Sequence, residues 1–247
     1  ALPRDGSVNF ERRTTAMGVL VLAGPRSRDV LARLTDADLS NDAFPWLTGK
    51  KMSIGLAQVD ALRVNFIGEL GWEIHHPIEM QNYIFDRLME AGAEFEIKPF
   101  GIRAMTSMAL EKSYKLSPRE LSVEYSAFES GLDRFVSLKK PTFHGRDALL
   151  AWQEQGGANT LVTMEVHNVT DADARGSEPI YHGDDVVGRV TSGGYGWRVG
   201  KSLALAMVRP DLAQLGAEFE IAILGVRHKA TIIADSPFDP DNNALKS

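Results

Sequence analysis

Glu73 is the residue of this sequence whose type and surroundings are best suited to chemistry. It lies in the run Trp72-Glu73-Ile74-His75, directly after a turn flanked by glycines. A buried carboxylate must be paired or hydrogen-bonded, and it can accept paired N–H donors from a heterocycle. The alternative is an edge-strand glutamate that faces water. The residues alone therefore make Glu73 a candidate binding residue without naming a ligand.

The histidines do not form a metal-binding pattern. His75 and His76 are adjacent on an expected strand, so their rings face opposite ways and make a poor chelating pair. No H-E-x-x-H or two-histidine-one-carboxylate spacing occurs. The chain also has no cysteine, which removes thiolate metal sites, disulfides and a cysteine nucleophile. We therefore predict no metal site and expect surface or hydrogen-bonded histidines.

A second candidate for chemistry is a glycine-rich run, Thr191-Ser192-Gly193-Gly194-Tyr195-Gly196. No helix obviously follows it, so no helix dipole is directed at a phosphate there. We expect instead a loop that turns sharply between two strands. The motifs G-x-S-x-G, Walker A and G-x-G-x-x-G are absent, which leaves serine hydrolases, nucleotidases and dinucleotide binders without support. The catalytic residue stays unknown.

Composition limits the class of protein. The 247 residues are 44% hydrophobic, enough for a sizeable core, and the formal net charge of −6 argues against nucleic-acid binding. The absence of cysteine suits a reducing compartment, and no apolar run approaches the roughly 20 residues that span a bilayer. We expect a cytoplasmic protein that is not bound to membranes. The chain begins with Ala1 rather than Met, which indicates an internal fragment or a processed chain.

The first half of the chain alternates strand and helix patterns. Gly68 and Gly71 flank a tight turn between two expected strands, and at least one of them should have a positive φ. In the second of these strands, Glu73 and His75 should face away from Trp72 and Ile74. The expected strands are 18–23, 62–67 and 72–76, and the expected helices are 25–34, 78–91 and 99–112.

After Pro141 the pattern changes to a short helix, 145–155, and then to short strands separated by turns. The expected strands are 161–166, 185–191, 203–208, 218–224 and 229–233. Their spacing predicts a small antiparallel barrel or sandwich, and of the two we expect the barrel. The fold class is therefore α+β, with a mixed or antiparallel sheet and packed helices in residues 1–140 and a small antiparallel β-barrel in residues 141–247.

Several segments, taken in order, resemble the folate-binding aminomethyltransferase family, whose founding member is the glycine-cleavage T-protein. The resemblance covers about residues 17–235. It is carried by MGVLVLAGP followed by DVL, by RVNFIGELGWE, LEK, FESGL and FHGRDAL, and by VGRVTSG and KSLALA. The variants W-E, L-E-K-S-Y and K-S-L-A-L-A are similar to the dimethylglycine and sarcosine dehydrogenase branch.

The resemblance implies a fold and an activity. The first half would be part of the T-protein folate fold, with tetrahydrofolate as the cofactor. In the dehydrogenase branch a preceding flavin domain, which holds the FAD, oxidises an N-methyl amine, and the folate region captures the one-carbon unit. The family region begins upstream of Met17, and its missing part carries an aspartate that contacts the folate nitrogen. The chain would therefore be incomplete alone, and an upstream flavin and folate segment or another chain would supply the rest.

The resemblance also assigns site residues. The second glutamate of the family's hairpin contacts the pterin ring and falls on Glu73. The matching position of the family's helix arginine is occupied here by Met105, and the nearest basic residue is Arg103, two residues earlier. Tyr114 would stack or hydrogen-bond in the cleft, or pack in the core. These three residues are the candidate cofactor-binding residues.

Three alternatives to the dehydrogenase assignment stay open. The first is a demethylase that moves a methyl group from a sulfonium or aryl ether to tetrahydrofolate. The second is a non-catalytic folate-binding assembly factor for iron–sulfur proteins, although that branch carries a K-G-C-Y-x-G-Q-E signature and this chain has no cysteine. The third is a docking module without folate affinity.

Overall fold

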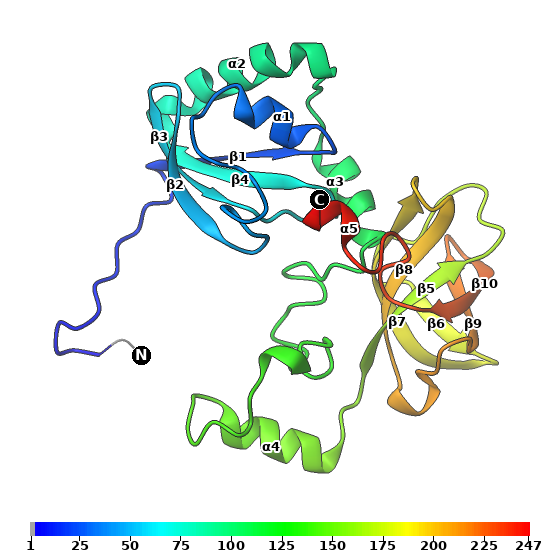
Figure 1. Cartoon of the computed structure of the whole chain (residues 1–247). Coiled ribbons are helices and arrows are strands. Elements are labelled where there is room, and N and C mark those ends of the chain that lie inside the picture. The colour runs from blue at the N-terminus through cyan, green and yellow to red at the C-terminus, as the bar shows by residue number, and fades with distance from the viewer. Residues whose placement is uncertain (1–2) are drawn as a thin grey trace. The chain divides into compact units, whose positions relative to one another are not determined.

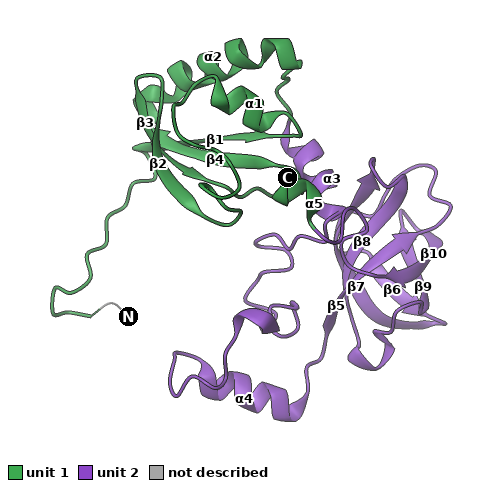
Figure 2. Cartoon of the chain, in the orientation of Figure 1, with its two compact units in different colours: residues 1–100, 242–247 green, residues 101–241 purple. Residues whose placement is uncertain are grey.

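The computed structural model describes residues 3–247; Ala1 and Leu2, at the start discussed above, lie outside the described residues. The chain forms two compact units (Figure 2). Unit 1 contains the residues up to Phe100 together with Asn242–Ser247, and unit 2 is Gly101–Asp241. Within residues 3–247, every helix is too short or too polar to cross a bilayer.

Unit 1 is built on a four-stranded antiparallel sheet with the strand order β1-β4-β3-β2. Helices α1 and α2 cover one face of this sheet (Figure 1). The strands are β1 (Met17–Ala23), β2 (Gly49–Ile54), β3 (Ala57–Leu62) and β4 (Gly71–Pro77), and the helices are α1 (Ser27–Ala32), α2 (Gln81–Gly92) and the short C-terminal α5 (Asn243–Lys246). Two 3-10 turns, Ile78–Met80 and Ala93–Phe95, flank α2.

The core of unit 1 lies between the sheet and the two helices. Trp72 and Ile74 of β4 are fully buried and pack with Leu31 of α1 and Ile84 of α2. Apolar side chains at alternate strand positions supply one continuous buried face, as the period of a strand requires. The remaining strand residues, at the alternate positions, therefore point their side chains to the opposite face of the sheet.

One buried cation ties residues 242–247 to unit 1. Arg63 is only 1% exposed. Its Nη1 donates to Asn41 Oδ1 and to the Phe44 carbonyl, both at 2.7 Å, and its Nη2 donates to the Ser247 carbonyl at 2.9 Å. Burial, and then the neighbouring Arg28, lower the pKa of Arg63. The buried guanidinium has five N–H donors that need acceptors, and segments far apart in the sequence, around residues 41–44 and 245–247, supply acceptors to Nη1 and Nη2.

Unit 2 is dominated by a closed antiparallel barrel with the strand order β10-β5-β8-β7-β6-β9. The strands are β5 (Thr160–Val166), β6 (Pro179–His182), β7 (Asp185–Gly196), β8 (Lys201–Val208), β9 (Glu218–Ile223) and β10 (Val226–Ile233). Helices α3 (Ile102–Leu110) and α4 (Arg146–Gln155) and a 3-10 turn at Asp133–Phe135 precede the barrel. A second 3-10 turn, Pro210–Leu212, lies between β8 and β9. The predicted α+β class with a following antiparallel barrel is confirmed.

Two local predictions are wrong. Of the expected strand 62–67, only Leu62 lies in a strand, as the last residue of β3; residues 63–67 form a loop. The side chain of Asn65 binds the backbone of this loop: its Oδ1 accepts from the Ile67 and Gly68 amides, and its Nδ2 donates to the Glu69 carbonyl at 2.6 Å. The glycine-rich run 191–196 is not a turn but the second half of β7. Its glycines allow close packing, since a Cβ on Gly193 would lie 2.4 Å from the Ala174 carbonyl oxygen.

The predicted domains, 1–140 and 141–247, stay a prediction. The compact units of the structure divide the chain differently: the boundary lies between Phe100 and Gly101, and residues 242–247 belong to unit 1.

Candidate functional site

The candidate site lies on the face of the unit 1 sheet that α1 and α2 do not cover. Glu73 on β4 lies directly between Val21 on β1 and Leu62 on β3. His75, two residues further along β4, lies between Val19 and Asp60. Val19 and Val21 are 46% and 42% exposed, so this face is open along β1. The predicted orientation of Glu73 and His75, opposite to Trp72 and Ile74, is confirmed.

The carboxylate of Glu73 is recessed on this open face. Its side chain is 19% exposed, and its Oε2 lies 3.2 Å from Nε2 of His75. Within residues 3–247 no other hydrogen bond to this carboxylate is recorded, so Oε1 and one lone pair of Oε2 remain available. A carboxylate between aliphatic side chains can accept two N–H groups from the edge of a flat heterocycle while the apolar neighbours contact its ring.

The loop before β4 brings the chain into this position. Asn65 closes the loop with the hydrogen bonds described above, and Gly68 has a φ of +73°. This confirms that at least one of Gly68 and Gly71 has a positive φ. Gly71 is needed for another reason: it pairs with Ala23, and a Cβ at Gly71 would lie 2.6 Å from the Leu22 carbonyl oxygen.

Replacing Gly71 with Ala is expected to lower the free energy of unfolding by about 1–3 kcal/mol, because the new methyl group meets backbone that cannot move aside without shifting β1. The start of β4 should also shift, and with it Glu73, so ligand affinity should fall as well. Thermal melts and ligand titrations on the same variant measure the two effects. The matched control is Gly101→Ala, where a Cβ has no atom within 4 Å. Equal stability of the two variants would contradict the close approach.

The other two predicted site residues belong to unit 2. Arg103 lies in the first turn of α3 and is exposed, and its side chain makes no hydrogen bond or ion pair with any residue in the described part of the chain. Tyr114 follows α3, is half-buried, and its amide donates to the Ala109 carbonyl at 3.0 Å. Burial raises the pKa of Tyr114, Arg198 opposes this shift, and Asp239 adds to it. Glu73 belongs to unit 1, and the binding roles of all three residues stay predictions.

Sequence reasoning missed the buried ion pair that anchors the end of α3. Glu111 is completely buried, and its Oε1 accepts from the backbone amides of Arg198 and Val199 at 2.6 and 3.3 Å. Its Oε2 pairs with Nε of Arg198. The guanidinium of Arg198 also donates to the Met108 carbonyl and lies 3.8 Å over the Phe238 ring. The sequence marks Glu111 only as a charged residue at the end of an apolar helix and carries no signal for its partner Arg198.

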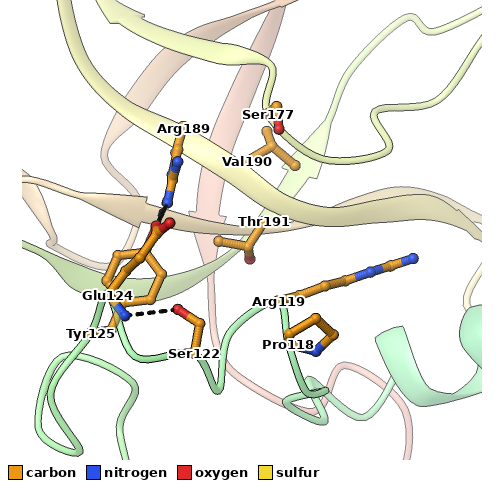
Figure 3. Close-up of a pocket in the computed structure, with 9 residues that line it drawn as sticks. All are labelled: Pro118, Arg119, Ser122, Glu124, Tyr125, Ser177, Arg189, Val190 and Thr191. Atoms are coloured by element: carbon orange, nitrogen blue, oxygen red, sulfur yellow. Dashed lines mark hydrogen bonds and ion pairs between the residues drawn. The ribbon is translucent and has the colours of Figure 1, made fainter.

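A small polar cavity lies on the outside of the barrel (Figure 3). Its volume is about 190 Å³, and none of the predicted site residues lines it. Arg189 of β7 donates through Nε to the Tyr125 hydroxyl at 2.8 Å and pairs with Glu124. These two partners raise the pKa of Arg189. The cluster fastens the segment before α4 to the barrel. Within residues 3–247 no group of three or more His, Asp or Glu side chains could hold a metal ion.

Models of two protein-family domains match the chain. The GCVT N-terminal domain matches residues 1–140, and the glycine cleavage T-protein C-terminal barrel domain matches residues 159–239. This chain belongs to the glycine cleavage T-protein family. The family membership predicted from the sequence is thereby confirmed.

Relatives of this T-protein family chain include long dehydrogenases. The mitochondrial dimethylglycine dehydrogenase of Mus musculus is 39% identical over 229 residues, which are 92% of this chain and 26% of that protein. The mitochondrial sarcosine dehydrogenase of the same species is 34% identical, over 93% of this chain and 26% of that protein. An aminomethyltransferase of Desulfitobacterium hafniense is 30% identical, over 92% of this chain and 61% of that protein. The chain thus spans about a quarter of the length of these dehydrogenases.

A solved structure of the family has the same fold. The crystal structure of the glycine cleavage system aminomethyltransferase T from Bartonella henselae matches with a TM-score of 0.79 at 21% identity. The match covers 91% of this chain and 60% of that chain. Because the match covers 91% of this chain, it includes both the sheet of unit 1 and the barrel of unit 2.

Proposed function

We propose that this chain binds tetrahydrofolate and is the folate-binding part of an N-methyl amine dehydrogenase that acts on a substrate such as dimethylglycine or sarcosine. Its function would be folate-dependent one-carbon transfer. The observation that carries the proposal is the recessed carboxylate of Glu73, which lies between Val21 and Leu62 on an open sheet face. Its only hydrogen-bond partner among residues 3–247 is His75. Membership of the T-protein family and the two dehydrogenase relatives support the same class of reaction.

The residues present fit the pterin part of tetrahydrofolate. An aminopterin offers neighbouring N–H donors on one edge, which match a carboxylate acceptor, and two flat apolar ring faces, which match Val21 and Leu62. Arg103 and Tyr114 of unit 2 are proposed as further folate-binding residues. Bound folate supplies the acceptor for the one-carbon unit, and this chain binds and orients it. FAD would belong to another domain, since the G-x-G-x-x-G motif is absent here.

Two alternatives stay open, and only the first of them uses the same site. A folate-dependent demethylase acting on a sulfonium or ether would also need Glu73, and the substrate distinguishes the two enzymes. A docking module would need no folate affinity, and then the recessed carboxylate of Glu73 would have no ligand. The cytoplasmic location stays a prediction, and the names of both dehydrogenase relatives place those proteins in mitochondria.

The test is a calorimetric titration of the full-length protein that carries this chain with tetrahydrofolate, followed by turnover assays with dimethylglycine, sarcosine and methylated sulfonium compounds. We expect saturable folate binding and folate-dependent capture of the one-carbon unit from an N-methyl amine. We expect no turnover by the 247 residues alone, because the dehydrogenase relatives are far longer. Absence of folate binding to the full-length protein would favour the docking module. Turnover of sulfonium compounds alone would favour the demethylase.

A further inference from the structure

We infer that His75 is a positioning residue for Glu73: its imidazole fixes the carboxylate in the orientation that receives the ligand. The inference rests on the proposed function, because it concerns how the folate site is built. His75 is not among the binding residues that the family resemblance assigns.

The geometry places one nitrogen of His75 on one oxygen of Glu73. The two residues are two apart on β4, so their side chains leave the same face of the sheet. Nε2 of His75 lies 3.2 Å from Oε2 of Glu73, within hydrogen-bond distance. The imidazole is only partly exposed, at 31%, so the contact is sheltered on one side. In the tautomer with hydrogen on Nε2, the imidazole donates and the carboxylate accepts.

The neighbours of His75 on the adjacent strands are one apolar and one charged residue. Val19 on β1 lies directly opposite on one side and Asp60 on β3 on the other. The Asp60 carboxylate is bound by Lys51 of β2 at 2.7 Å. The titratable groups on this part of the face are therefore Glu73 on the histidine's own strand and Asp60 with Lys51 on the neighbouring strands, while β1 contributes only apolar residues. The Lys51–Asp60 pair and the His75–Glu73 pair therefore lie on neighbouring strands of this face.

The hydrogen bond has a consequence for binding. A free glutamate side chain rotates among several conformers, and a ligand that selects one of them must overcome the loss of that freedom. The imidazole occupies one lone pair of Oε2 and fixes the carboxylate plane, so that Oε1 and the other lone pair of Oε2 stay directed at the open face. A ligand with two adjacent N–H donors would then meet an acceptor that is already oriented.

The experiment is a double-mutant cycle on tetrahydrofolate affinity in the full-length protein. We expect His75→Leu to weaken binding about tenfold when Glu73 is present, and to change it less than twofold in the Glu73→Gln background. His75→Gln keeps an N–H donor of similar reach and should restore most of the affinity. The matched control is His144→Leu, which removes an exposed imidazole in unit 2. It should leave the affinity unchanged.

A second measurement does not depend on folate. The ring nitrogens of His75, observed by ¹⁵N NMR, should show a protected Nε2–H whose signal moves in Glu73→Gln. If Glu73→Gln weakens binding but His75→Leu does not, the inference about His75 is wrong and the proposed function stands. If Glu73→Gln leaves binding unchanged, the proposed folate site itself is wrong. An effect of His75→Leu that is equal in both backgrounds would show a general structural role and would also overturn the inference.

Discussion

Replacing Arg198 with Met is expected to lower the free energy of unfolding of unit 2 by about 3 kcal/mol, because it leaves a buried carboxylate without its charged partner. Glu111 is completely buried and pairs with Arg198, whose side chain is 20% exposed. The backbone amides of residues 198 and 199 still donate to Glu111 in the variant. The loss in the free energy of unfolding should therefore lie at the lower end of the range for broken buried ion pairs. Differential scanning calorimetry of the chain would measure the change.

The matched control is Arg189→Met. Arg189 also lies in the β7–β8 part of the barrel and also pairs with a glutamate, but it and Glu124 are 50% and 60% exposed. Exposed pairs contribute about 0–1 kcal/mol, so this variant should change stability little. The double variant Arg198→Met with Glu111→Leu should recover part of the lost stability, since the buried charge is then removed as well. If the two arginine variants were equally stable, Glu111 would not be the anchor of α3.

Replacing Glu73 with Gln is expected to weaken tetrahydrofolate binding about ten- to a hundredfold, equivalent to roughly 1.5–3 kcal/mol. Glutamine keeps the shape of the side chain but exchanges one acceptor oxygen for a donor, so one charge-assisted hydrogen bond to the ligand is lost. Because Glu73 is recessed, water replaces the lost hydrogen bond poorly, and the loss of affinity should be larger than for a glutamate on an open surface. Calorimetric titration gives the dissociation constants directly.

The control for this variant is Glu79→Gln, which removes the same charge from an exposed position just after β4. A long-range effect of net charge would weaken binding in both variants, whereas a contact with the ligand would weaken it only in Glu73→Gln. Equal dissociation constants for the wild type and Glu73→Gln would remove Glu73 from the site.

The strands that the sequence predicts correctly are those with a clear apolar pattern, either alternating, as in β5, or continuous, as in β8. In the barrel, 161–166 and 203–208 coincide closely with β5 and β8. The short β6 was missed, since its four residues begin with a proline and are too few to show a period. The hairpin of β2 and β3 was missed as well, because alanines fill several inward positions of β3 and give a weak apolar signal.

The candidate site could be predicted only in part. Alternation along β4 places Glu73 and His75 on one face, and the structure agrees. Their neighbours Val21, Leu62 and Asp60 come from other strands, and only the register of the sheet brings them together. The sequence carries no local signal for that register. The Glu111–Arg198 pair joins residues far apart in the chain, and for the same reason it emerges only from the structure.

The interleaved order of the two units has a consequence for how the chain folds during synthesis. Unit 1 begins before unit 2 and is completed by residues 242–247, which follow it. Until those residues leave the ribosome, the buried guanidinium of Arg63 lacks two of its acceptors, the carbonyls of Leu245 and Ser247. The barrel, whose strands are all made before residue 242, can close first. Residues 242–247, which are synthesised after the barrel strands, therefore complete the hydrogen bonding of Arg63 in unit 1, and their removal would leave that buried guanidinium with fewer acceptors.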